Sequence, residues 1–275
     1  MGLRIATNVA SIAAQRNLAR SEANVARASR ALSSGSRIVS PGDDAAGFAI
    51  AESLRAQAAS MAQAKENADA ARGLIQVAEG GLSEQNNILI RLRELAVQSA
   101  SDTVSDTERE FLDIEFQNLV AELDRIAHAT RYGSKELLVG SGTEYEFHVG
   151  AGSKNEDVVR YRLDADTRAS SLYIDDLSVS DKYDAREALE YIDEAILKIA
   201  HARASFGAMQ SRLEIAAANL DLQRENILEA RSRIADTDVA FEVSNLVQAQ
   251  VQRDFGVAVL AQANQEPARA LKLLA

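Results

Sequence analysis

A seven-residue repeat in the C-terminal half constrains the fold more than any other feature. Eight consecutive positions of the repeat carry large apolar side chains: Ile192, Ile199, Phe206, Leu213, Leu220, Ile227, Ile234 and Phe241. Positions three residues further on are mostly small, such as Ala195, Ala202 and Ala216. Such a repeat keeps a narrow apolar seam on one side of a long helix, and the seam packs against a partner helix. We therefore predict one helix of roughly 50 residues from Tyr183 towards Phe241, about 75 Å long.

A second seam of the same period lies between Ala45 and Ala100. Its heptad positions are Leu54, Met61, Ala68, Ile75, Leu82, Leu89 and Ala96. Gly80 and Gly81 interrupt this seam and indicate a bend or a close backbone contact, since glycine costs about 1 kcal/mol in a helix relative to alanine. Because the two seams match in length and period, we expect the two helices to pair.

Three further helices are expected. Met1 to Ala31 predicts a helix that is marginal alone, because isolated helices are weak without a packed face. Ser105 to Ala129 begins with a capping box formed by Ser105 and Glu108. A break at Asp236–Asp238 precedes a final helix from Val239 to Gln265, which is followed by an apolar tail.

Residues 130–182 differ in character from the helical segments. Apolar and polar residues alternate around Tyr145, Val159 and Leu172, and glycines separate these stretches. Period-two alternation with glycine turns predicts short strands in hairpins. About 50 residues of β structure cannot form a large core, so we expect a β-rich excursion at one end of a helical bundle.

The composition excludes several classes of function. The net charge is -11 and the pI is near 4.9, which argues against nucleic-acid binding because phosphates need a positive surface. Cysteine is absent, so disulfides and thiolate metal sites are excluded. No apolar run approaches the roughly 20 residues that a membrane-spanning helix needs. The N-terminus lacks a secretory cleavage pattern, so export without a cleavable signal peptide is expected.

Candidate catalytic or metal-binding residues do not form a constellation. His128, His148 and His201 are scattered without metal-ligand spacing. The Gly150–Lys154 stretch lacks the full spacing of a phosphate-binding loop and predicts a hairpin turn. Adjacent carboxylates at Asp43–Asp44 predict a helix cap. We therefore expect no enzyme activity, no cofactor and no metal.

A membrane-surface role for the N-terminal helix is an alternative. Arg4, Arg16, Arg20, Arg27 and Arg30 provide the basic side chains that interfacial helices use. The acidic balance of the whole chain argues against this alternative.

Several stretches resemble the bacterial flagellin family. They appear in the order expected for that family and cover roughly the first 140 and the last 90 residues. The stretches are ALSSGSRIVSPGDDAAGFAIAESLRAQ (31–57), RLRELAVQSAS (91–101), RIAHATRYGSKELL (125–138), ARSRIADTDVAFEVSNLVQAQV (230–251) and VLAQANQEPARALKLL (259–274). Residues 139–183 carry no such likeness and are short, so the large outer domains of some flagellins are absent.

The resemblance implies a mainly α fold, in which long coiled-coil-like antiparallel helices from both chain ends form a rod with a small β-hairpin region. Residues 1–43 and 235–275 would form an inner core domain. Residues 44–234 would form a helical rod domain with a β-rich excursion at about 130–183. The implied function is a structural subunit that polymerises into the extracellular flagellar filament for motility.

The resemblance also implies partners and polymerisation residues. The partners are many copies of the chain, a type III export apparatus, a chaperone on the C-terminal helix, and filament cap and junction proteins. Termini with apolar faces but weak helicity are expected to be disordered in the monomer and to fold on assembly. The expected polymerisation residues are Ile5, Val9, Ile12, Leu18, Val25, Leu246, Val247, Val251, Phe255, Val259, Leu260, Leu271 and Leu274.

Recognition by a Toll-like innate receptor is a further implication of the resemblance. The contact block of the family matches Arg91, Leu95 and Gln98, and Glu115 aligns with a further contact. The alternative is that these residues serve subunit packing.

Two rival functions remain at this stage. A hook–filament junction protein of the same superfamily shares related terminal helices. A soluble coiled-coil adaptor would also explain the seams, and it predicts a stable helical monomer or dimer with protected termini.

Overall fold

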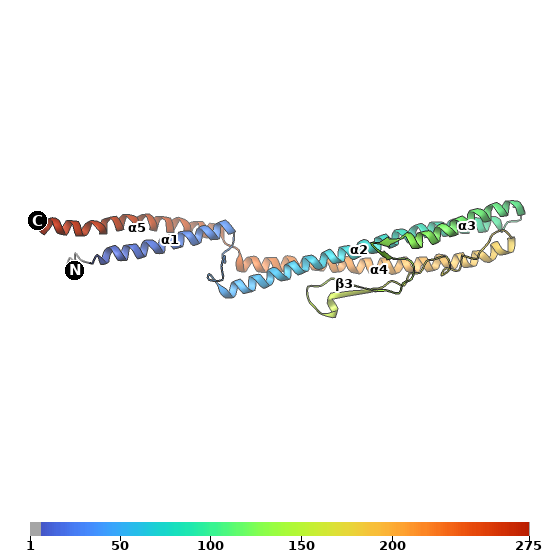
Figure 1. Ribbon diagram of the computed structural model, residues 1–275, viewed down its shortest axis with the longest axis horizontal. Coiled ribbons are helices and arrows are strands. Elements are labelled where there is room, and N and C mark those ends of the chain that lie inside the picture. Colours follow the sequence, from blue (N-terminus) through green and yellow to red (C-terminus); the bar gives the residue numbers. More distant parts are fainter. Residues whose placement is uncertain (1–6, 275) are drawn as a thin grey trace. The chain divides into compact units, whose positions relative to one another are not determined.

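The computed structural model describes the backbone of residues 7–274 and the side chains of residues 7–265. These residues form mainly helices, as predicted (Figure 1). The long elements are α1 (Val9–Ser34), α2 (Ala45–Ser99), α3 (Asp106–Ala129), α4 (Lys182–Ala235) and α5 (Val239–Leu274). Four short strands and the 3-10 helix η1 (Asn155–Asp157) lie between α3 and α4.

The chain divides into two compact units. One unit comprises Met1–Ala56 and Asn226–Ala275, and the other comprises Gln57–Glu225. Helices α2 and α4 each contribute residues to both units. The domain limits expected after residues 43 and 234 stay a prediction.

The helix ends follow the expected capping chemistry. Ser105 and Glu108 form both hydrogen bonds of a capping box at the start of α3. At the start of α2, the Asp44 carboxylate accepts a hydrogen bond from the Gly47 backbone N–H at 2.9 Å. Helix α1 ends at Gly35, which has a left-handed φ of 68° that favours glycine. The predicted caps at Asp44 and Ser105 are therefore confirmed.

Helices α2 and α4 pair in antiparallel orientation within residues 57–225. Three ion pairs join them, Lys65–Asp221, Glu79–Arg203 and Arg93–Asp193. The residue number rises along α2 as it falls along α4, which fixes the antiparallel direction. The predicted pairing of the two seams is confirmed.

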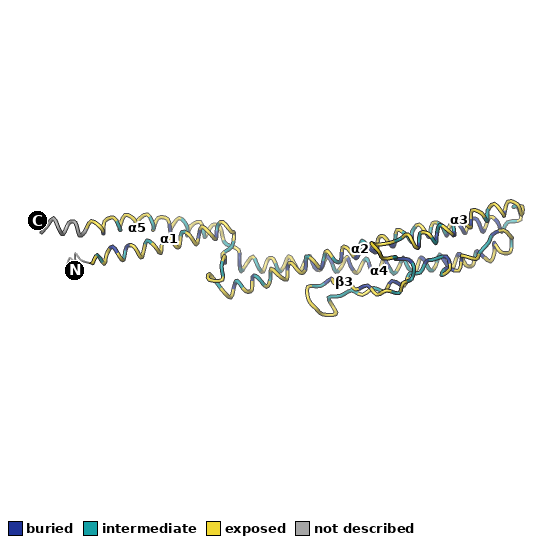
Figure 2. Tube along the Cα trace, in the orientation of Figure 1, coloured by how far each residue is buried: buried dark blue, intermediate teal, exposed yellow. Residues whose placement is uncertain are grey.

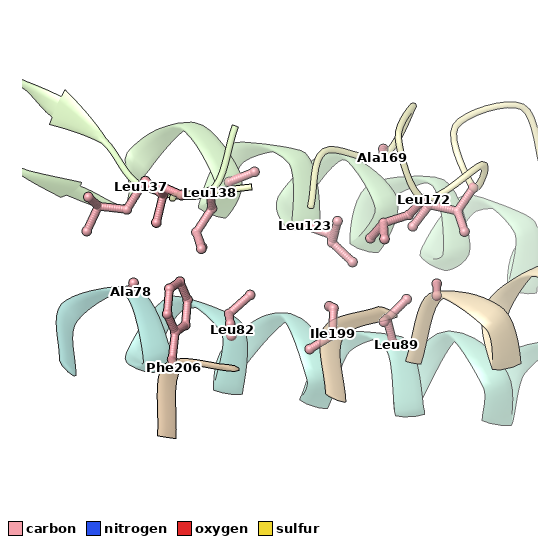
Figure 3. Packing of buried hydrophobic residues seen from close by; sticks show 14 of the residues in the cluster. Ala78, Leu82, Leu89, Leu123, Leu137, Leu138, Ala169, Leu172, Ile199 and Phe206 are labelled. Atoms are coloured by element: carbon pink, nitrogen blue, oxygen red, sulfur yellow. The ribbon is translucent and has the colours of Figure 1, made fainter. Parts of the chain in front are cut away.

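The seams form the centre of the hydrophobic core. The side chains of Ile75, Leu82 and Leu89 on α2 and of Ile199 and Phe206 on α4 are 0% exposed. Figure 3 shows Leu82 and Leu89 of α2 together with Ile199 and Phe206 of α4 on one side of the core. They face Leu123 of α3 and the loop residues Leu138 and Leu172 on the other side. The core is therefore completed by α3 and by the segment that follows it.

The C-terminal seam loses its burial towards the end of α4. Leu220 is buried, Ile227 and Ile234 are half-buried, and Phe241 is 66% exposed. The helix ends at Ala235, and the Asp238 carboxylate then accepts hydrogen bonds from the backbone of Ala240 and Phe241. The predicted break at residues 236–238 is confirmed, and Phe241 belongs to the next helix.

The β structure consists of two small antiparallel hairpins. Strands β1 (Arg131–Tyr132) and β2 (Lys135–Glu136) form the first hairpin, which the sequence did not indicate. Strands β3 (Glu144–His148) and β4 (Val158–Arg162) form the second, with Glu144 opposite Arg162. In the loop between β3 and β4, the Lys154 backbone N–H donates to the Asp157 carboxylate, so the stretch from Gly150 to Lys154 is a turn, as predicted.

The strand expected around Leu172 and Ile174 does not form. Backbone N–H groups of these two residues donate to the carbonyls of Arg168 and Ala169, and Tyr173 has a left-handed φ of 59°. The resulting turn buries both Leu172 and Ile174 in the core. Because a turn and a strand both bury alternate residues here, the alternation alone does not separate them.

The two glycines in the middle of α2 behave differently. The helix continues through both of them without interruption. A Cβ at Gly81 would lie 2.5 Å from Thr130 Oγ1 and 2.8 Å from Leu138 Cδ1, whereas a Cβ at Gly80 would meet no atom within 4 Å. Gly81 therefore makes the expected close contact, and Gly80 has no such reason within the chain.

We predict that Asp166→Asn makes stability less dependent on acidic pH. Hydrogen bonds from Arg168 lower the pKa of the Asp166 carboxyl from 3.8 to about 2, and this side chain is only 26% exposed. A carboxyl with a lowered folded-state pKa stabilises the fold above pH 3.8 and loses that contribution as the pH falls towards 2. The substitution is expected to cost about 2 kcal/mol at pH 7, with most of this cost lost by pH 2 and the rest below it.

Urea unfolding of wild type and variant at several pH values measures this difference. Asp164→Asn is the matched control, because Asp164 pairs with Arg162 and is 63% exposed. Its cost is expected to stay below about 1 kcal/mol, as for other exposed ion pairs. An Asp166→Asn cost that does not change with pH would contradict the assignment.

Candidate assembly surface

Helices α1 and α5 pack against each other in antiparallel orientation. At one end, the Asn8 side-chain amide donates to the Ala263 carbonyl at 2.8 Å, and the Ser11 hydroxyl donates to Asn264 Oδ1 at 2.8 Å. At the other end, the backbone of Ser36 pairs with that of Asp236. These contacts join segments more than 190 residues apart along the chain, as the residue numbers show.

The contact between α1 and α5 buries small side chains. Among the residues whose side chains are described, its fully buried apolar residues are alanines: Ala14, Ala28, Ala31, Ala249 and Ala263. An added Cβ at Gly256 would lie 3.4 Å from Leu18 Cδ1, so the two helices approach closely. Alanine offers little apolar area to remove from water, and the free energy gained by burial is roughly proportional to that area.

Large apolar side chains on α5 point away from this contact. They recur at every fourth residue and are 43–69% exposed: Val239, Val243, Val247, Val251, Phe255 and Val259. We call these six residues the α5 ridge. Residues four apart form a continuous row on a helix surface, and such rows fit into the grooves of neighbouring helices. Figure 2 shows α5 as mostly exposed along its described length.

The structure divides the predicted polymerisation residues into three groups. Leu18, Val25, Leu246 and Leu260 are half-buried, and the prediction had not separated these from the fully exposed residues. Ile5 lies outside the described residues, as do the side chains of Leu271 and Leu274. The exposed group comprises Val9, Ile12, Val247, Val251, Phe255 and Val259.

Four exposed large apolar residues of α5 are absent from the predicted polymerisation residues. Val239 and Val243 extend the ridge, and Val257 and Phe241 lie outside it with 53% and 66% exposure. The four-residue spacing from Val239 to Val259 is present in the sequence. A seven-residue repeat does not contain this spacing.

The expected receptor-recognition residues lie on α2 and α3. The Arg91 guanidinium donates to Glu115 Oε1 at 3.0 and 2.8 Å and to Glu94 Oε2 at 3.0 Å. The hydrogen bonds that Arg91 donates to Glu115, followed by the one that it donates to Glu94, raise the pKa of Arg91. Gln98 is exposed, but Leu95 is 0% exposed and lies in the core. Only three of the four residues therefore offer side chains to a partner.

A shallow apolar surface accompanies these three residues. Ile90 and Val97 on α2 are 46% and 49% exposed, and they line a depression together with Arg93, Glu94 and Gln98. Neither Ile90 nor Val97 was among the predicted recognition residues. Their exposure follows from their position on α2, away from both α3 and α4.

The described residues contain neither a metal-binding group nor a membrane-spanning helix. In this part of the chain, no group of three or more His, Cys, Asp or Glu side chains is arranged to hold a metal ion. None of the described helices is both long and apolar enough to span a lipid bilayer.

Two family descriptions match this chain. Residues 5–143 match "Bacterial flagellin N-terminal helical region", and residues 189–274 match "Bacterial flagellin C-terminal helical region". The chain is 40% identical to a flagellin of Halalkalibacterium halodurans over 88% of its own length and 89% of the relative. It is 36% identical to the flagellar filament 33 kDa core protein of Treponema phagedenis, covering 97% of this chain and 98% of the relative.

A solved structure is similar as well. The crystal structure of Bacillus cereus flagellin superposes with a TM-score of 0.50 and 28% identity, covering 56% of this chain and 88% of that one. The likeness therefore extends to the helical architecture described above.

We predict that substituting a phenylalanine of the exposed ridge and one of the core changes the free energy of unfolding by very different amounts. Phe255→Ser should change the free energy of unfolding by no more than about 0.5 kcal/mol, because Phe255 is 69% exposed. Phe206→Ala should cost about 3–5 kcal/mol, because Phe206 is fully buried. Chemical unfolding of each purified variant measures both values, and a large loss for Phe255→Ser would contradict the placement of the ridge.

Proposed function

The chain belongs to the bacterial flagellin family and is a structural subunit of a flagellar filament, and we propose that α1 and α5 form the inner layer of that filament. The family is structural, and its filaments are extracellular polymers of many copies. The proposal concerns how this subunit uses its terminal helices to assemble.

The α5 ridge is the observation that carries the proposal. An unassembled subunit leaves these six large apolar side chains in water. Among the described residues, its α1–α5 contact fully buries alanines and only half-buries larger side chains such as Leu18 and Leu246. Exposed apolar surface of this extent is typical of a binding interface. Neighbouring copies supply the missing cover, and contacts of this kind that do not close into a ring generate helical filaments.

The small apolar area buried between α1 and α5 also affects whether the chain ends are ordered before assembly. Ordering one residue costs about 1–2 kcal/mol of conformational free energy, and burial must offset this cost. The alanine contact between α1 and α5 supplies little burial. We propose that residues 1–43 and 235–275 become ordered on assembly and form the inner core domain, and that residues 44–234 form the surrounding layer.

Export and assembly partners belong to the same proposal. Large exposed apolar side chains on α5 need cover before polymerisation, and a cytoplasmic chaperone bound to α5 would provide it. Ends that lack a fixed structure suit passage through a narrow type III export channel. Filament cap and junction proteins would then contact the first and last copies.

The filament subunit is favoured over the two rivals. Relatives that cover nearly the whole chain carry the names of filament proteins, which favours this function over a hook–filament junction protein. A coiled-coil adaptor would be held together by its apolar seam, and the α5 ridge outside that seam would remain exposed to water.

Seeded polymerisation tests the proposal. Purified chain is mixed with short filament fragments, and growth is followed by light scattering and electron microscopy. We expect filaments from wild type, and a strong loss of growth for the double variant Val251→Asp and Phe255→Asp, because two carboxylates would be buried in the interface.

Brief trypsin treatment of dilute, unassembled chain tests the state of the ends. Helix α1 offers exposed cleavage sites at Arg16, Arg20, Arg27 and Arg30. We expect rapid loss of about 40 residues at each end, whereas assembled filaments should resist. Protected ends in dilute subunits would contradict ordering on assembly and favour the adaptor.

Receptor recognition is a second proposal for the surface around Arg91. The Arg91–Glu115 pair joins α2 to α3 and presents both charges beside exposed Gln98. In this proposal a Toll-like receptor binds the side chains of Arg91, Glu115 and Gln98. Leu95 is buried, so its role would be to hold α2 in place through the core. The alternative remains that the pair serves packing between subunits.

A reporter assay with soluble chain tests recognition. Arg91→Ala should reduce the receptor response, whereas the exposed Arg125→Ala on α3 should not. The double variant Arg91→Glu with Glu115→Arg can still form an ion pair. Its positive and negative side chains have exchanged positions, so it should also reduce the response. An equal response from wild type and Arg91→Ala would remove the proposal.

A further inference from the structure

An irregular segment covers part of the core within residues 57–225. Residues 163–181 lie between β4 and α4 and belong to neither a helix nor a named strand. We call this segment the strap. Figure 3 shows Ala169 and Leu172 of the strap on the same side of the core as Leu123 of α3. The buried apolar residues of the strap are Leu163, Ala169, Leu172, Ile174 and Val179.

Helix α2 binds the main chain of the strap at two places. Gln85 Nε2 donates to the Thr167 carbonyl at 3.2 Å, and it also donates to the carbonyl of Leu123 on α3 at 3.1 Å. The Ser99 hydroxyl donates to the Val179 carbonyl. Both Gln85 and Ser99 are 0% exposed. Since buried main-chain groups need hydrogen-bond partners, these two side chains satisfy carbonyls that strand pairing does not.

Helix α3 also binds the main chain of the strap. The Asp124 carboxylate accepts a hydrogen bond from the Ala169 backbone N–H at 3.2 Å. The Asp113 carboxylate accepts one from the Val179 backbone N–H at 2.8 Å. Hydrogen bonds to a charged acceptor are stronger than those between neutral groups. Residues 113 and 124 are three helical turns apart and therefore lie on one face of α3.

The strap runs in one direction along both helices. Its residue numbers rise with those of α2 and fall with those of α3. Between the two carboxylates of α3, Gln117 Nε2 donates to the Leu177 carbonyl at 2.8 Å, and the Ser178 hydroxyl donates to Asp113 at 3.0 Å. All five helix side chains bind main-chain atoms of the strap. We call Gln85, Ser99, Asp113, Gln117 and Asp124 the strap clamp.

Gln85 and Ser99 are polar residues in an otherwise apolar row of α2. The row consists of buried residues at a spacing of seven: Ala64, Ala71, Ala78, Gln85, Leu92 and Ser99. Gln85 Oε1 has no hydrogen-bond partner among the described residues, so Gln85 costs stability at this buried position. An isolated polar residue in an apolar seam specifies the alignment of packed segments at a cost in stability.

The strap needs such a mark because nothing else fixes its position along α2. A shift of seven residues along a heptad repeat brings apolar side chains to the same face again. Main-chain groups recur at every residue of the strap and cannot distinguish one alignment from another. Gln85 and Ser99 are fourteen residues apart, about 21 Å along the helix, and define two fixed points.

We propose that Gln85 and Ser99 determine the position of the strap along α2, and that the strap clamp recognises the main chain of the strap rather than its exposed side chains. The contact lies within one subunit and does not depend on the proposed assembly. All five clamp residues fall inside the first flagellin match, whereas the strap lies between the two matches. Exposed side chains of the strap are therefore free to change, provided that twelve residues separate the two bound carbonyls.

Trypsin cleavage after Arg168 measures opening of the strap. Arg168 is the only lysine or arginine in the strap. The next residue, Ala169, is buried and its backbone N–H is bound by Asp124, so cleavage there requires the strap to open. The full chain is digested briefly, and mass spectrometry follows the peptide that begins at Ala169. Circular dichroism of the same samples gives the thermal unfolding temperature.

Gln85→Leu should speed up cleavage after Arg168 about tenfold, because the Thr167 carbonyl loses its donor. The unfolding temperature should not fall in parallel, because leucine gains apolar contacts at a seam position. Ser99→Ala, a smaller change, should also speed up cleavage. Gln98→Leu is the matched control, since Gln98 is exposed on the same helix and should leave the cleavage rate unchanged.

An insertion separates the spacing of the strap from its side chains. One serine inserted between Asp175 and Asp176 changes the separation of the two bound carbonyls from twelve residues to thirteen, and it should speed up cleavage about tenfold. The triple variant Ser170→Ala, Asp175→Ser and Asp176→Ser alters three exposed residues and keeps the spacing, so it should be cleaved like wild type. In the Gln85→Leu background the insertion should add little, because the two changes act on one contact.

Three results would overturn the proposal. The first is a wild-type cleavage rate in both Gln85→Leu and Ser99→Ala, or in Ser99→Ala alone where Gln85→Leu does not fold. The second is faster cleavage of the triple variant, which would show that the strap's own exposed side chains hold it in place. The third is an insertion effect that adds in full to that of Gln85→Leu, since the two would then be independent.

Discussion

The antiparallel packing of α2 against α4 is the interaction on which the rest of the subunit depends. Helices of this length gain their stability from packing, because isolated helices are marginal in water. The paired seams bury an unbroken row of side chains, and ion pairs such as Lys65–Asp221 and Arg93–Asp193 lie along its flanks. Helix α3 and the loop around Leu172 then cover one side of this pair and leave the other sides open.

In the terminal helices, small apolar side chains are buried and large ones are exposed, which is the reverse of a typical protein core. Between α1 and α5 the buried apolar residues are alanines, while valines and Phe255 face outward. The same preference of apolar surface for leaving water that assembles the α2–α4 core therefore remains unsatisfied at the ends. In the proposed assembly, polymerisation satisfies this preference, so the stability of the ends and the growth of the filament become one free-energy balance.

The sequence predicted the features that have a strong period or a local chemical cause. The seams, the Ser105 capping box and the break near Asp238 all depend on nearby residues. Features that depend on distant docking were missed. Leu95 lies off the heptad seam, and its burial follows only once α3 is placed against α2. Leu172 and Ile174 alternate like a strand, but a turn at Tyr173 buries both.

Gly80 and Gly81 show why a structure adds information about assembly and not only about folding. The two residues are identical neighbours in one helix, and nothing local in the sequence separates them. The structure gives Gly81 a reason in Thr130 and Leu138 and gives Gly80 none. A destabilising residue with no cause inside the subunit indicates a cause outside it.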